Sequence, residues 1–169
     1  MKENQGAVYA YQIEYWTVFL SVTAGVAATL TGLIFVAISI NLSRILEFPR
    51  LADRAAESIL QILGPLIVSI WALVPGQPRL LIGIGMAVAG FVLWILQTLL
   101  QYRSFTREHP RPVISILLGQ SSTLTFLIAG ISLATETLGG LNQWLVPGVI
   151  LSITAGVSNA WVLLVEILR

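Results

Sequence analysis

Residues 18–40 read VFLSVTAGVAATLTGLIFVAISI and contain no charged side chain. A helix needs about 20 mostly apolar residues to cross the hydrocarbon core of a bilayer, so this segment is long enough to span it. Tyr15 and Trp16 directly precede the segment, where an interfacial aromatic belt would lie. The run is too long for a signal peptide and lacks a clear basic region and cleavage site, so we expect a retained transmembrane helix.

The rest of the chain has the same apolar character. Of its 169 residues, 56% are hydrophobic and only 10% are charged, and the mean hydropathy is +0.87, far from the composition of soluble domains. Short polar breaks separate four further apolar runs, and no linker is long enough to divide two domains. We therefore predict one all-α transmembrane domain over residues 1–169, a helix bundle with spans at about 18–40, 59–74, 80–100, 113–134 and 144–168.

The second run is the shortest, and it contains Pro65, which removes a helix hydrogen bond and should kink the segment. Pro75 and Gly76 follow it in the order that suits a type II turn, so the second and third runs should form a tight hairpin. Two interpretations remain open. Either the chain crosses the membrane five times, or it has three spans plus a re-entrant hairpin.

Basic residues near the ends of spans are retained on the cytoplasmic side of a membrane. The N-terminal flank and the loop between the second and third runs contain only Lys2 and Arg79. We therefore expect the N-terminus outside and the C-terminus in the cytoplasm. Seven arginines share the predicted cytoplasmic side: Arg44, Arg50, Arg54, Arg103, Arg107, Arg111 and Arg169.

Small residues recur at three- and four-residue steps along the first, third and fifth runs. Helices in lipid associate closely where small residues let their backbones approach. We expect these stripes to form helix contacts, within the chain or with a second protein. The residues are Gly25, Ala28 and Gly32, then Gly83, Ala87 and Gly90, then Gly148, Ser152 and Ala155.

Polar side chains gather at one depth when the spans are aligned at the predicted cytoplasmic boundary. Such a layer could line an inward-open cavity, or its amides could hydrogen-bond neighbouring helices for about 1 kcal/mol each, and we favour the second interpretation. The expected polar pathway or interhelical network consists of Gln61, Gln97, Gln120, Asn159 and Glu166. Glu57 opens the second run, where a carboxylate at a helix N-terminus is favourable, so we expect it to act as a cap.

The sequence has few residues that could carry out catalysis or bind a metal or cofactor. The net charge is +1, which gives nucleic-acid binding no support, and there is no cysteine for disulfides or thiolate chemistry. His109 is the sole histidine and lacks the partner that a zinc motif needs. No nucleophile elbow, phosphate loop or dinucleotide fingerprint occurs. We expect no catalytic residues, metal site or cofactor, and hence no enzyme.

The segment TGLIFVAISINL at 31–42 continues with Arg44-Ile45-Leu46, Arg54-Ala55, Glu57 and LVPGQ at 73–77. This pattern resembles a group of small uncharacterised bacterial membrane proteins and covers roughly the first half of the chain. The resemblance implies a multi-pass protein of the bacterial inner (plasma) membrane, and it brings no site residues with it.

Two functions of different classes fit these observations. The first is a homo-oligomeric channel or transporter-like assembly for a small ion or solute, with the amide layer along a hydrated route. The second is a non-enzymatic accessory or regulatory subunit whose small-residue stripes contact a larger membrane protein. We favour self-association slightly, because one copy has few helices with which to enclose a pathway.

Overall fold

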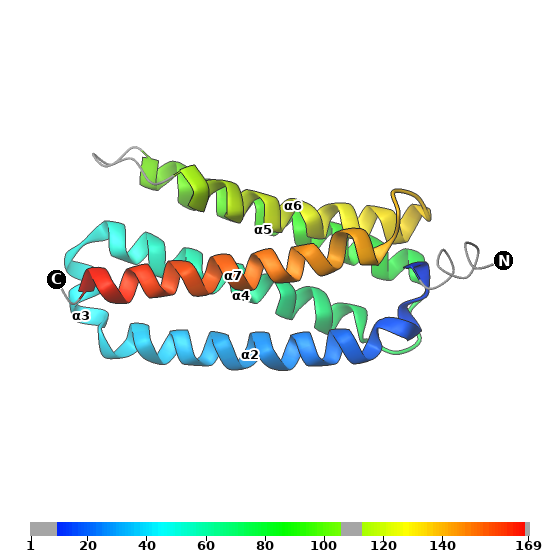
Figure 1. Cartoon of the computed structure of the whole chain (residues 1–169), viewed down its shortest axis with the longest axis horizontal. Coiled ribbons are helices and arrows are strands. Elements are labelled where there is room, and N and C mark those ends of the chain that lie inside the picture. The colour runs from blue at the N-terminus through cyan, green and yellow to red at the C-terminus, as the bar shows by residue number, and fades with distance from the viewer. Residues whose placement is uncertain (1–9, 106–112, 168–169) are drawn as a thin grey trace.

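The computed structural model describes residues 10–105 and 113–167, and that part of the chain is helical without any strand (Figure 1). Five helices are long and apolar enough to cross a membrane. The all-α, five-span bundle is therefore confirmed. A short 3-10 helix η1 (Ile13–Trp16) leads into α2 (Thr17–Ile40), α3 (Leu42–Glu47), α4 (Pro49–Ala72), α5 (Arg79–Phe105), α6 (Val113–Thr135) and α7 (Leu141–Ile167).

Helix α4 decides between the two interpretations of the second span. It begins at Pro49, not at Ile59, with proline in the first turn, where its missing N–H costs nothing. The helix continues through the buried Pro65 to Ala72 and is long enough to cross, so the re-entrant alternative has no support. The tight turn after it has Gly76 at φ 76°, the left-handed conformation that glycine adopts readily.

The long helices run side by side along the long axis of the molecule (Figure 1). Helices α4, α5, α6 and α7 contact one another in a closed ring and form a four-helix bundle. Helix α2 lies outside this ring, packed mainly on α4 and touching α7 at few places. We name the two ends of the bundle by their connections. The α3 end contains α3, the starts of α4 and α6 and the ends of α5 and α7, and the hairpin end contains the α4–α5 turn and the α6–α7 loop.

The small residues of α5 and α7 pack within the chain. A Cβ added to Gly83 would lie 2.6 Å from the backbone nitrogen of Ala134, and one added to Gly90 would overlap the backbone of Leu127. Helices α5 and α6 therefore touch backbone to backbone, which explains why they form the most extensive helix pair. On α7, a Cβ added to Gly148 would lie 2.6 Å from Thr125 Oγ1. Ala87 also lies against α6, and Ser152 and Ala155 are buried.

The predicted small-residue stripe of α2 does not pack within the chain. Gly25 and Gly32 have no side chain or foreign backbone within 4 Å of an added Cβ, and Ala28 is exposed. The expected close contact along this stripe is therefore absent from the single chain. It remains a prediction about contact with a second protein.

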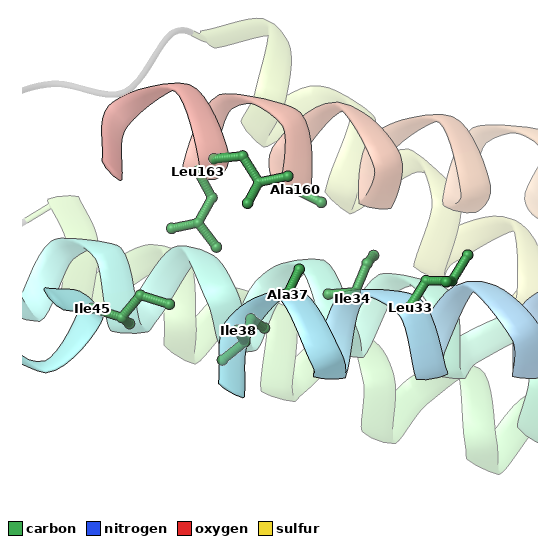
Figure 2. A pocket seen from close by; sticks show the side chains of 8 residues that line it. Leu33, Ile34, Ala37, Ile38, Ile45, Ala160 and Leu163 are labelled. Carbon is green, nitrogen blue, oxygen red and sulfur yellow. The ribbon is translucent and has the colours of Figure 1, made fainter. Parts of the chain in front are cut away.

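Toward the α3 end, α2 and α7 separate and leave an apolar cavity of about 160 Å³. Figure 2 shows Ile34 and Ala37 of α2 facing Ala160 and Leu163 of α7 across this space, with Ile45 of α3 near its end. All of the lining residues are apolar. The cavity therefore suits an acyl chain or apolar side chains and offers no polar route.

Candidate functional site

The centre of the candidate site is Glu57, which lies in α4 about two turns beyond Pro49 and is only 1% exposed. The expected role as a helix cap is wrong, because the helix starts earlier than the apolar run does. The Glu57 carboxylate accepts a hydrogen bond of 2.6 Å from Gln97 Nε2 and one of 3.1 Å from Gln101 Nε2. Both donors come from α5, where a four-residue spacing places them on one face.

The hydrogen bonds continue from α5 to α6. Gln120 Nε2 donates to Gln101 Oε1 at 2.7 Å and to Thr98 Oγ1 at 3.2 Å. Gln101 thus donates to the carboxylate and accepts from the next helix. Glu57, Gln101 and Gln120 link α4, α5 and α6 through side chains alone.

A second branch joins α4 to α7. Asn159 Nδ2 donates to Gln61 Oε1 at 3.1 Å, and Ser152 Oγ donates to the backbone carbonyl of Gln61. Gln61 lies one turn beyond Glu57 on α4, so the two branches meet on this helix. We refer to this set as the polar cluster: Glu57, Gln61, Gln97, Gln101, Gln120 and Asn159.

Gly119 of α6 leaves the space in which the polar cluster fits. A Cβ added there would lie 2.6 Å from Gln97 Nε2 and 2.9 Å from the Nε2 atoms of Gln101 and Gln61. Real Cβ contacts below 3.0 Å essentially do not occur, so any larger residue would displace these amides. The absence of a side chain at one position allows three glutamines from two helices to converge.

Two amide atoms at this point have no hydrogen-bond partner. Gln61 Nε2 and Gln97 Oε1 are buried and unpaired, one being a donor and the other an acceptor. Buried polar groups in proteins are nearly always paired with protein or with water. The polar cluster therefore has unused capacity for a small polar guest.

The half of the bundle toward the hairpin end is packed with apolar side chains. Phe126, Met86 and Leu133 are fully buried there, in a cluster to which α4 and α7 also contribute. Next to the polar cluster on α4, a Cβ added to Gly64 would lie 3.4 Å from side-chain atoms of both Phe126 and Leu93. Among the described residues, the buried amide and carboxylate groups thus lie in the half toward the α3 end, whereas the buried polar side chains nearer the hairpin end are hydroxyl groups, among them Ser69 and Ser132.

A lateral cavity of about 270 Å³ lies beside the polar cluster between α4, α6 and α7. Asn159 belongs to both, since it lines the cavity and donates to Gln61. Arg54, Ser115 and Ser158 contribute the other polar groups of the lining. The exposed Ser158 and Val162 form part of its rim.

Among the residues that the sequence singled out, Gln61, Gln97, Gln120 and Asn159 lie in one hydrogen-bonded cluster. Glu166 is part of α7, but its side chain is outside the described residues. Sequence analysis did not identify Glu57, Gln101 or Gly119 as site residues. The sequence signal for Glu57 and Gln101 was their four-residue spacing from Gln61 and Gln97, which places each pair on one helix face. Nothing in the sequence distinguished Gly119 from a glycine that serves helix packing.

No protein-family model, curated protein or solved structure matches this chain. The site must therefore be interpreted from its own residues. Among the side chains that the structure describes, no three His, Cys, Asp or Glu residues lie together so as to hold a metal ion. His109 falls outside the described residues. A single buried carboxylate surrounded by amides is the chemistry that the described part of the chain offers.

Proposed function

We propose that this protein is a non-enzymatic, transporter-like membrane protein that binds a small cation at the polar cluster from the cytoplasmic side. The observation that supports it is Glu57, a carboxylate that is buried within a membrane-spanning helix and hydrogen-bonded by Gln97 and Gln101. Ionisable residues within membranes are costly and rare, and they mark ion pathways and proton relays.

The groups around Glu57 suit a cation. Carboxylate and amide oxygens are the ligands that hard cations prefer, and Gln97 Oε1 is a buried amide oxygen without a partner. The arginine distribution predicts that the α3 end faces the cytoplasm, which would place the polar cluster in the inner leaflet. Passage across the whole membrane would then require the apolar half to open or a second copy to complete the route.

Purified protein in liposomes tests this proposal through the flux of Na⁺, K⁺ and H⁺, followed with ion-sensitive dyes. We expect Glu57→Gln and Gln97→Leu to lower flux at least about tenfold, since each removes a charge or polar group from the proposed route. Gln143→Leu is the matched control, because Gln143 is exposed in the first turn of α7, far from the cluster. Flux that is absent in the wild type, or equal in all variants, would refute the proposal.

The second candidate function is an accessory subunit of a larger membrane complex, and the α2 stripe favours it. Gly25, Ala28 and Gly32 offer an exposed surface with small side chains that would admit another helix at close range. The same surface would serve self-association in a transporter. Purification from native membranes separates the two functions, because a stoichiometric second protein supports the accessory role and a partner-free oligomer supports the first.

A further inference from the structure

The lateral cavity beside Asn159 combines two kinds of surface. Arg54, Ser115 and Asn159 supply polar and charged groups, whereas the remaining walls come from Leu118 and Val162 and from neighbouring apolar residues. Its volume of about 270 Å³ is large enough for a polar group bigger than water. A lining that is cationic and polar in one part and apolar in another suits an amphiphile better than a free ion.

The depth of the cavity agrees with a headgroup. Arg54 lies in the first turns of α4, just inside the candidate span that begins at Leu51. Val113 starts α6, and Ile114 of its first turn lines the same cavity and is strongly exposed. The charged group therefore lies near the end of the spans, where phosphates of a leaflet are found. Val162 lies at about the same depth, since the neighbouring Leu163 packs with Leu51 and Ala55, and Leu118 and Ala155 line the cavity deeper in the bilayer.

We propose that this cavity binds an anionic phospholipid of the leaflet at the α3 end, with its phosphate at Arg54 and its acyl chain against Leu118 and Ala155. Guanidinium groups recognise phosphate oxygens through parallel hydrogen bonds, and basic pockets between helices on the cytoplasmic side bind anionic headgroups. Ser115 and Ser158 supply hydroxyl groups at the same cavity. A free phosphate ion would share the chemistry of the headgroup but would leave the apolar wall uncovered.

The site also joins the lipid to the polar cluster. Asn159 lines the cavity and at the same time holds Gln61 through a hydrogen bond of 3.1 Å. A headgroup that hydrogen-bonds Asn159 would either compete with Gln61 for the Asn159 amide or hold that amide in its position beside Gln61. The bound lipid would then be part of the surroundings of the buried cluster. This proposal stands on the cavity and does not depend on the ion-binding function.

Native mass spectrometry of the full chain in detergent tests the proposal. The probes are phosphatidylglycerol, phosphatidylcholine and inorganic phosphate. The variants are Arg54→Gln, which removes the charge, and Ser158→Phe, which fills the rim from an exposed position and keeps Arg54. Arg44→Gln is the matched control, because Arg44 is an exposed residue of α3 that does not line the cavity.

We expect one phosphatidylglycerol to remain bound to the wild type and to Arg44→Gln with affinities equal within about twofold, and both other variants to bind at least about tenfold more weakly. Phosphatidylcholine should bind more weakly than phosphatidylglycerol, and millimolar phosphate should not displace the lipid. If Arg54→Gln and Arg44→Gln lose affinity for phosphatidylglycerol equally, the lipid is held by general attraction to surface charge, and the proposed site is wrong. Retention by Ser158→Phe, or displacement by phosphate, would also overturn it, the latter in favour of a free-anion site.

Discussion

Gly119→Ala is the most direct perturbation of the polar cluster, because it adds one methyl group where three amides meet. The new carbon would lie 2.6 Å from Gln97 Nε2 and 2.9 Å from Gln101 Nε2, so both amides must move. These amides are the donors to Glu57, at 2.6 and 3.1 Å. The substitution should therefore break or lengthen hydrogen bonds to a buried carboxylate.

The magnitude follows from opposing contributions. Alanine in place of helical glycine stabilises by up to about 1 kcal/mol. Overpacking costs about 1–3 kcal/mol, and weakening one hydrogen bond to a charged group costs about 1.5–3 kcal/mol. The terminal amides have little free space into which to move, so both costs apply, and after subtracting about 1 kcal/mol for alanine we expect a net loss of about 1.5–5 kcal/mol in the free energy of unfolding.

Equilibrium unfolding by SDS in mixed micelles, followed by far-UV circular dichroism, measures this change. Gly25→Ala is the matched control, since an added Cβ at Gly25 meets nothing within 4 Å and should not lower stability. Repeating Gly119→Ala in a Gln97→Leu background should shrink the penalty, because the closest amide nitrogen has gone. A Gly119→Ala protein as stable as Gly25→Ala, or an unchanged penalty in the double variant, would refute the reasoning.

Substitutions at Glu57, Ser152 and Gly90 extend the test to other contacts. Glu57→Leu should lower the free energy of unfolding by about 1–3 kcal/mol for each amide donor left unpaired, whereas Glu57→Gln keeps an acceptor and should cost less, as unfolding in SDS would show. Ser152→Ala removes the hydrogen bond to the Gln61 carbonyl and should cost about 0.5–1.5 kcal/mol in the same assay, with no change expected if that contact does not form. Gly90→Leu should separate α5 from α6 and reduce the yield of folded protein, measured by size-exclusion chromatography. Gly32→Leu, at an open position, should leave the yield of folded protein unchanged, and equal yields of the two variants would contradict the close packing of α5 on α6.

The sequence predicted the long helices well where the apolar run and the helix coincide. Helix α2 begins at Thr17 and ends at Ile40, against an expected span of 18–40, because no charged residue interrupts it. The start of α4 was missed, because residues 50–58 are rich in charged side chains and look like a loop by hydropathy. The chain is helical there nonetheless, since Ile45, Leu51 and Ala55 pack against Leu163 of α7. Tertiary contact, which a hydropathy window does not include, extends the helix.

Only part of the candidate site was predicted, because hydropathy identifies polar residues within apolar runs but not contacts between helices. Intramembrane amides are conspicuous in apolar runs, so Gln61, Gln97 and Asn159 were identifiable from their positions alone. Glu57 was assigned to a helix end only because the helix was started too late. The role of Gly119 depends on side chains that reach it from two other helices, and no local pattern encodes that. The orientation of the bundle remains a prediction from the arginine count.

The central place of α4 has a consequence for biogenesis. Of the five candidate spans, it has the lowest mean hydropathy and the largest buried share, and it contains the buried Glu57 and Gln61. A nascent α4 that entered lipid alone would expose both groups to hydrocarbon. The cost is about 2.5–3.5 kcal/mol for a charged residue at the centre of a helix, which sets the upper limit for Glu57 because it lies closer to the end of the span. The donors that offset this cost for Glu57 are Gln97 and Gln101, which are synthesised next and connected through the tight turn at Gly76. We therefore expect the insertion machinery to release α4 into the bilayer together with α5, as a paired hairpin.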